Sequence, residues 1–179
     1  MSKIGVKPIE IPNNINIELN ENLIKVKGPK GELSLNFDKS KVEVVKENNI
    51  LKFIPFNKKE KRYKEYWGTI KRLVENMIKG VTEGFEKKLV VEGIGYRANI
   101  QNNKLILTVG FANPLEVEIP KELQVSVKEN VITISGIDKA KVGQFAAYVR
   151  ALKKPDVYRG KGIRYIDEKI KFKVGKAGV

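Results

Sequence analysis

The feature that most constrains the fold is a repeat within the sequence. The tripeptide Glu-Ile-Pro at residues 10–12 recurs at residues 118–120, an offset of 108, and the correspondence continues without a gap. It reaches Gly28, which corresponds to Gly136, and apolar residues correspond to apolar residues in between. A shared frame this long is hard to reach by chance. The sequence therefore predicts two copies of one small module.

Each copy carries the same kinds of pattern. Apolar residues alternate with polar ones at Ile15, Ile17 and Leu19, which indicates a half-buried strand. A recurrence every three or four residues predicts helices over 63–81 and 142–152, the second ending before a proline. Single helices that follow runs of strands are typical of the α+β class. We therefore expect two tandem α+β copies, residues 1–82 and 83–179, each an antiparallel sheet packed against one helix.

The positive charge of the chain is unevenly distributed. The formal net charge is +14, from 35 basic and 21 acidic residues. Residues 1–82 carry +7, residues 83–138 carry −2, and residues 139–179 carry +9. A surface built for solubility alone mixes the two signs along the chain. The concentration of cations in the last segment predicts a docking face for a polyanion.

The composition excludes many chemistries. The chain contains no His and no Cys, so a zinc finger, a cysteine protease or a Ser-His-Asp triad cannot be built. We expect no enzyme, no cofactor, no metal site and no small-molecule substrate. No apolar run approaches the length of a membrane span, and the first residues do not resemble a secretory signal, which favours a cytoplasmic protein without a membrane partner.

One motif imitates a nucleotide site. Residues 93–98 fit the pattern G-x-G-x-x-A of the dinucleotide fingerprint and follow an expected strand. That fingerprint needs a helix next, because the helix N-terminus holds the pyrophosphate. Here the chain continues with an expected hairpin over 97–109, so we interpret the glycines as a tight bend between strands.

An aromatic run opens the first helix. Tyr63, Tyr66 and Trp67 could stack on bases, but Trp67 continues the same apolar face as Ile70 and Val74. We therefore favour a core role for these aromatic residues. The basic residues just before them, 58–62, fit a phosphate contact and a solvated helix start equally well.

The strongest constellation of candidate binding residues lies after the second helix. Gly160 and Gly162 allow the backbone to turn and to approach a partner closely. Cations flank these glycines, and Lys and Arg both bind phosphate. Tyr158 and Tyr165 offer flat faces for stacking on unpaired bases. Further on, lysines alternate with apolar residues over 169–174, the pattern of a strand with one lysine face. The predicted RNA-binding residues are Lys153, Lys154, Tyr158, Arg159, Gly160, Lys161, Gly162, Arg164, Tyr165, Lys171, Lys173 and Lys176.

This segment resembles a known family. Residues 155–165, Pro-Asp-Val-Tyr-Arg-Gly-Lys-Gly-Ile-Arg-Tyr, are similar to the C-terminal signature of the bacterial large-subunit ribosomal protein L6 family. The resemblance extends to residues 2–12, to the helix over 67–77 and to residues 93–98. Arg159 stands where the family usually has Lys, and Val157 where it commonly has Pro. The first departure keeps the charge, and the second removes some stiffness from the loop.

The resemblance implies a function. Members of that family are non-enzymatic proteins of the large subunit that bind ribosomal RNA mainly through the C-terminal domain, near the sarcin–ricin loop and the region where translation factors dock. It therefore implies large-subunit ribosomal RNA and neighbouring ribosomal proteins as partners, with translation factors nearby, and a location in the ribosome.

Two other functions compete with this one. A non-ribosomal nucleic-acid binder, such as an RNA chaperone, fits the same charge distribution, and a chaperone would leave ribosomal particles at high salt. An enzyme that uses Lys or carboxylate chemistry is the weaker alternative, because the sequence offers no paired carboxylates in a recognisable setting.

Overall fold

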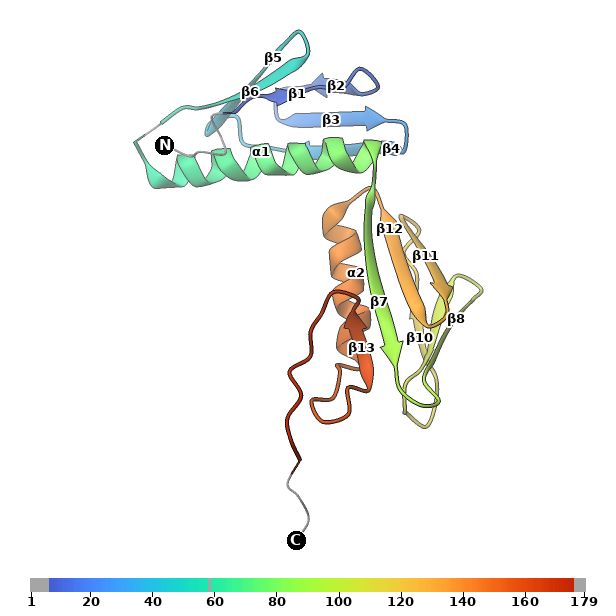
Figure 1. Ribbon diagram of the computed structural model, residues 1–179. Coiled ribbons are helices and arrows are strands. Elements are labelled where there is room, and N and C mark those ends of the chain that lie inside the picture. Colours follow the sequence, from blue (N-terminus) through green and yellow to red (C-terminus); the bar gives the residue numbers. More distant parts are fainter. Residues whose placement is uncertain (1–6, 58, 176–179) are drawn as a thin grey trace. The chain divides into compact units, whose positions relative to one another are not determined.

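The computed structural model describes residues 7–57 and 59–175 and divides the chain into two compact units (Figure 1). Unit 1 holds the chain up to Phe85 together with Ile137–Lys139. Unit 2 holds Glu86–Gly136 and the chain from Ala140 onward. The division predicted from the sequence, after residue 82, stays a prediction, and it did not foresee that residues 137–139 group with the first unit.

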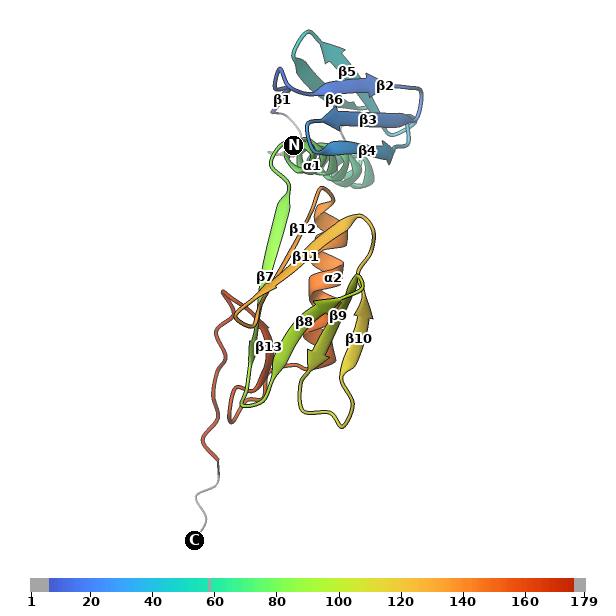
Figure 2. The ribbon, with the colours of Figure 1, turned by 90° about the vertical axis from the view of Figure 1, so that its right-hand side faces the viewer.

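Unit 1 contains two three-stranded sheets and one long helix. The sheet orders are β1-β6-β5 and β2-β3-β4, and all their neighbouring strands are antiparallel. Figure 2 shows β2, β3 and β4 side by side, with α1 close to them. The elements are β1 (Ile9–Glu10), β2 (Asn16–Leu19), β3 (Leu23–Gly28), β4 (Gly31–Asn36), β5 (Val42–Glu47), β6 (Ile50–Pro55) and α1 (Lys61–Thr82).

The buried residues of unit 1 recur as the sequence patterns predict: every second residue in strands and every third or fourth residue in the helix. Alternate residues of β3 and β6, such as Ile24 and Leu51, are buried, and so are residues three or four apart on α1, such as Val74 and Ile78. Trp67 lies in the same core with 6% of its surface exposed, which confirms the core role expected for it.

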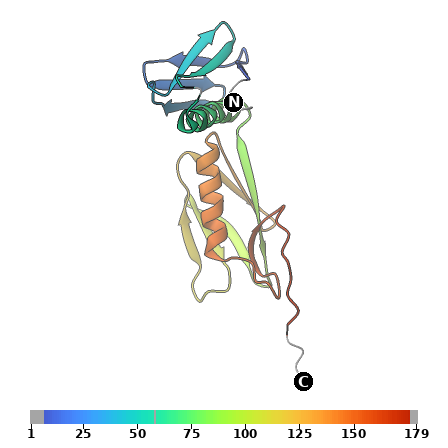
Figure 3. The same ribbon diagram turned by 90° about the vertical axis from the view of Figure 1, so that its left-hand side faces the viewer.

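Unit 2 contains the same kinds of element as unit 1, with one additional strand. Its sheets have the orders β10-β9-β8 and β11-β12-β7-β13, and α2 lies along them (Figure 3). The predicted class, α+β in two duplicated copies, is confirmed. The elements are β7 (Phe85–Glu92), β8 (Arg97–Gln101), β9 (Lys104–Thr108), β10 (Leu115–Glu118), β11 (Leu123–Lys128), β12 (Val131–Gly136), α2 (Lys139–Leu152) and β13 (Gly162–Tyr165).

The two units contain equivalent strands in a permuted order. Strands β1–β3 correspond to β10–β12 at the offset of 108, and the amides of Ile11 and Ile119 donate to Asn49 and Asn103 respectively. Asn49 and Asn103 are 54 residues apart, which is half of 108. Adding this half offset of 54 to β4–β6 leads to β7–β9, so these two sets of strands correspond. The amides of Phe37 and Val91, again separated by the half offset, donate at 2.9 Å to Asn22 and its repeat Asn130. The module is therefore duplicated with its two strand triplets exchanged along the chain.

Two local expectations meet different outcomes. The motif at 93–98 is a tight turn after β7, with φ of 147° at Gly93 and 78° at Gly95, and the next element is strand β8 rather than a helix, as expected. The strand expected over 169–174 is wrong: these residues form no strand or helix. The amide of Lys173 donates to the carbonyl of Val157 instead, so this segment lies beside the loop that contains Val157 and not beside a strand.

Candidate nucleic-acid interface

The residues between α2 and β13, 153–161, form a loop that we call the basic loop. Four hydrogen bonds tie it to itself and to the start of β13. The backbone amide of Asp156 donates to Lys161, the amide of Gly160 donates back to Asp156, and the amide of Ile163 donates to Lys153, at 2.8–2.9 Å. The carboxylate of Asp156 accepts the amide of Arg159 at 2.7 Å. This acidic side chain therefore fixes the shape of a cationic loop.

Gly162 is required by close packing inside the chain. A Cβ at this position would lie 2.6 Å from Cα of Pro155 and 2.7 Å from the carbonyl oxygen of Lys154, and φ is 150°. The sequence predicted a glycine that lets the backbone approach a partner. In the structure the close approach is to the preceding residues of the same chain.

Three of the predicted RNA-binding side chains in the basic loop extend into solvent. Lys154, Tyr158 and Arg159 are exposed, and 59% of the surface of Tyr158 is accessible. Within the described residues no acidic side chain pairs with Lys154, Arg159 or the half-buried Lys161. Their charges are therefore available to an external anion.

Arg164 has different surroundings. Its guanidinium forms an ion pair with Glu92 and donates to the carbonyl oxygens of Tyr165 and Glu168, both at 3.4 Å. The hydrogen bond to Glu92 raises the pKa of Arg164 above its ordinary value. This arginine joins β13 to β7, and its contact with RNA stays a prediction.

Two cations lie near the ring of Tyr165. The Nζ of Lys87 lies 5.6 Å from the centre of its ring, and the guanidinium carbon of Arg150 lies 5.8 Å from it, within the range of cation–π attraction. The ring is half-buried, unlike that of Tyr158. Of the two tyrosines predicted to stack on bases, the structure leaves only Tyr158 open.

A second ion pair fixes the turn after β13. Arg150 of α2 donates to both carboxylate oxygens of Glu168, through Nε at 2.7 Å and through Nη2. The same carboxylate accepts the amide of Tyr165 at 3.2 Å. Hydrogen bonding to Arg150 lowers the pKa of Glu168. Glu92 and Glu168, two acids near the basic loop, are thus occupied by structural partners.

Residues 169–175 run beside the basic loop. A Cβ on Gly160, where φ is 73°, would lie 3.0 Å from the ring of Phe172, so this ring packs over the glycine. Phe172 stays 63% exposed, and Lys171 and Lys173 on either side are exposed as well. Lys176, also predicted to bind RNA, lies outside the described residues.

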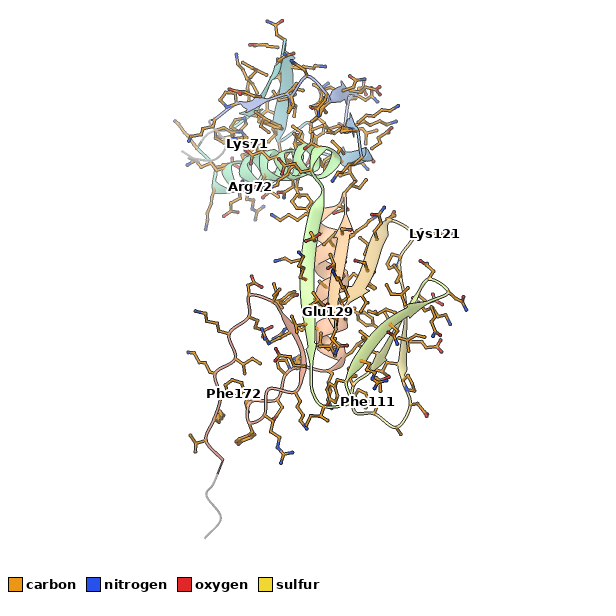
Figure 4. All side chains as sticks on the ribbon, turned by 45° about the vertical axis from the view of Figure 1, so that its right-hand side comes forward. Lys71, Arg72, Phe111, Lys121, Glu129 and Phe172 are labelled. Atoms are coloured by element: carbon orange, nitrogen blue, oxygen red, sulfur yellow. The ribbon has the colours of Figure 1, made fainter. Side chains whose placement is uncertain are left out.

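One aromatic neighbour of the basic loop was not predicted from the sequence. The Nζ of Lys153 lies 4.7 Å from the ring centre of Phe111, in the loop between β9 and β10 (Figure 4). Phe111 is 47% exposed and follows Gly110, where φ is 78°. An apolar residue after a glycine at a turn was the available signal, although nothing in the sequence connects it to Lys153.

The described residues contain no cluster of acidic side chains able to hold a metal ion. None of the helices among them is long and apolar enough to cross a membrane.

Comparison with known proteins finds relatives among the proteins of the large ribosomal subunit. One from Dictyoglomus turgidum, named large ribosomal subunit protein uL6, is 48% identical over 180 residues, which cover 99% of each chain. One of the same name from Thermosipho melanesiensis is 49% identical over 183 residues, and uL6c of Arabidopsis thaliana is 44% identical over 79% of its own length. The model of the family Ribosomal protein L6 matches residues 11–84 and 92–166. The chain belongs to the ribosomal protein L6 family.

Membership settles the broad function. The chain is a structural, non-enzymatic component of the large ribosomal subunit, assembled with ribosomal RNA and ribosomal proteins, and the expected ribosomal, cytoplasmic location is confirmed. The two matched segments agree with the duplication. The roles of individual residues in the basic loop stay predictions.

Proposed function

We propose that this chain binds large-subunit ribosomal RNA mainly through unit 2, with the basic loop as the principal contact. The observation that carries the proposal is the contrast within the loop. Asp156 is used to hold the backbone, while Lys154 and Arg159 extend into solvent without acidic partners among the described residues. A loop whose shape is fixed before binding loses little conformational entropy when it meets a phosphate.

Phosphate contacts supply the affinity in this proposal. Cations that neutralise phosphates release counterions, so binding falls as the salt concentration rises. Lys171 and Lys173 extend the cationic surface beside the loop. Tyr158 adds a ring able to stack on an unpaired base, which is worth about 1–3 kcal/mol. Specificity comes from the shape of the RNA, because the deep groove of an A-form helix hides its base edges.

We also propose that the contacted RNA lies near the factor-binding region, with translation factors close by. The support is the resemblance of residues 155–165 to the family signature, together with membership of the family. A photoreactive group at Tyr158 in intact particles tests this location. Adducts in the RNA of the sarcin–ricin region are expected, and adducts confined to RNA distant from it would contradict the proposal.

Two matched double variants test the RNA contact itself. We expect Lys154→Gln with Arg159→Gln to weaken binding to large-subunit RNA. The plot of log affinity against log salt should also become shallower, its negative slope losing about 1.5 in magnitude, roughly 0.7–0.9 for each lost phosphate contact. The control is Lys121→Gln with Lys128→Gln, which removes the same charge from exposed lysines elsewhere on unit 2 (Figure 4 labels Lys121). Salt-dependent filter binding of the purified chains measures both slopes.

Equal loss in both double variants would mean that net charge alone drives binding. An unchanged slope in the loop variant would remove the basic loop from the interface. Arg164 is left out of the test because its ion pair with Glu92 would confound binding with stability.

A further inference from the structure

The duplication shows that, among the described residues, one sheet edge in unit 1 lacks a strand that its counterpart in unit 2 has. In unit 2 the outer edge of β7 is paired with β13. The equivalent strand in unit 1 is β4, and it is the last strand of its sheet. We propose that β4 pairs with an extended segment of a neighbouring protein of the large subunit, in the way that β7 pairs with β13.

The register identifies the groups that would pair. The amide of Phe37 donates toward β3, and backbone direction alternates along a strand, so Leu33 and Leu35 also face β3. Glu32, Ser34 and Asn36 therefore direct their amides and carbonyls away from β3. Among the described residues, Ser34 and Asn36 make no hydrogen bond on that side.

The corresponding residues of unit 2 are occupied. Ser34 corresponds to Lys88, whose carbonyl accepts the amide of Ile166 at 3.1 Å. Asn36 corresponds to Val90, which lies opposite Arg164 of β13. The pairing that we propose for β4 thus exists in the same chain, on the same strand of the repeated module.

Burial differs at the equivalent leucines. Leu89 on β7 is fully buried, and Ile163 of β13, on the same face of the sheet, is fully buried too. Leu35 on β4 packs against the core of unit 1 but stays partly exposed. An apolar side chain on an added strand would cover Leu35, as β13 helps to cover Leu89.

The open stretch is short and has defined ends. Ile137 lies beside the turn at Gly31, where a Cβ would be 3.3 Å from its side chain. At the other end, the hydroxyl of Tyr66 accepts the amide of Asp38 at 2.6 Å. Between these ends lie Glu32, Ser34 and Asn36, enough to pair a strand about as long as β13.

A polypeptide fits this edge better than RNA. Unpaired amides and carbonyls that alternate at the strand spacing are complementary to another strand, and added strands are a common mode of peptide recognition. The expected partner is antiparallel to β4 and carries an apolar residue at the position that faces Leu35. Because the chain is a component of the large subunit, its neighbours in the particle are the available partners.

Photocrosslinking in assembled large subunits tests the inference. A p-benzoylphenylalanine at Ser34 is expected to join one segment of another ribosomal protein, identified by mass spectrometry of the digested adduct. The control is the same group at Glu18, which lies in the same cross-strand row through Lys25 but on the opposite edge of the sheet. We expect no adduct with that segment from Glu18.

A pair of substitutions at Ser34 then separates backbone pairing from mere proximity, with the crosslinker moved to Asn36. Ser34→Pro removes an amide that faces away from β3, so the β3–β4 pairing is kept while an added strand is blocked. Ser34→Ala keeps the amide. We expect the adduct to be lost with Pro and retained with Ala. Adducts only with RNA, adducts with a second copy of this chain, equal adducts from Glu18, or an adduct that survives Ser34→Pro would each overturn the inference.

Discussion

Arg159 of the basic loop and Arg164 of β13 are close in sequence, but their side chains have different surroundings. Arg159 is exposed and has no acidic side-chain partner among the described residues, whereas Arg164 pairs with Glu92 and two carbonyl groups. A charge-assisted hydrogen bond contributes more to stability when it is partly shielded from water, and the Arg164 side chain is only 23% exposed. One arginine is therefore available for binding, while the other holds the fold.

We expect Arg164→Gln to lower the free energy of unfolding of unit 2 by about 1–2 kcal/mol, because it breaks a partly buried charged pair. Arg159→Gln should change it by less than about 0.5 kcal/mol, as for most exposed sites. Amide hydrogen exchange of β7 and β13 measures the difference locally. Equal protection of those strands in the two variants would contradict the structural role of Arg164.

The candidate site was predictable only in part at this scale. The types and spacing of Lys154, Tyr158 and Arg159 indicated an anion-binding loop, and the structure leaves them exposed. The sequence could not reveal that Arg164 pairs with the distant Glu92, or that Lys87 and Arg150 lie near the ring of Tyr165. Long-range partners depend on strand pairing that no local pattern specifies.

At the scale of elements, most strands and both helices followed from periodicity, because burial on one face selects alternate residues in strands and every third or fourth in helices. The segment 169–174 shows the limit of that argument. Its alternation suits a strand, but a strand also needs a neighbouring edge. Here Phe172 packs over Gly160 and the amide of Lys173 bonds to Val157, so the segment stays beside the basic loop.

Strand β13 begins at Gly162, where neighbouring atoms leave no room for a side chain. Gly162→Ala would combine a φ of 150° with overlap against Pro155 and Lys154, which together cost about 2–4 kcal/mol. Gly95→Ala is the matched control, since φ is 78° there but no atom lies within 4 Å of the added Cβ, and its cost should be about 1 kcal/mol. Denaturant unfolding of both variants measures the difference. If Gly162→Ala lowered the free energy of unfolding by less than Gly95→Ala, the close packing around Gly162 would be disproved.

At the scale of the whole molecule, the duplication was visible in sequence but its permuted order was not. The match at the full offset preserves identities, whereas the match at the half offset is carried mainly by burial and pairing, as at Phe53 and Leu107. Apolar residues can exchange freely while a core position is kept, so the sequence signal fades before the structural one.

Equivalent leucines should respond differently in the two units. Leu89→Ala removes a fully buried side chain and should cost about 2–5 kcal/mol. Leu35→Ala removes a partly exposed one, and we expect the free chain to lose less than half as much. Hydrogen exchange resolved for each unit measures both losses. Equal losses would show that the edge of β4 is already closed in the free chain.

The pairing of β7 with β13 has a consequence for the order in which the chain folds. The two strands enclose everything from Gly93 to Lys161, so their contact is a long loop closure, while β2, β3 and β4 are joined by adjacent hairpins. During synthesis those hairpins can form early, but the sheet of unit 2 stays incomplete until Tyr165 has been added. A nascent chain therefore presents the basic loop in its final conformation only after β13 has been synthesised.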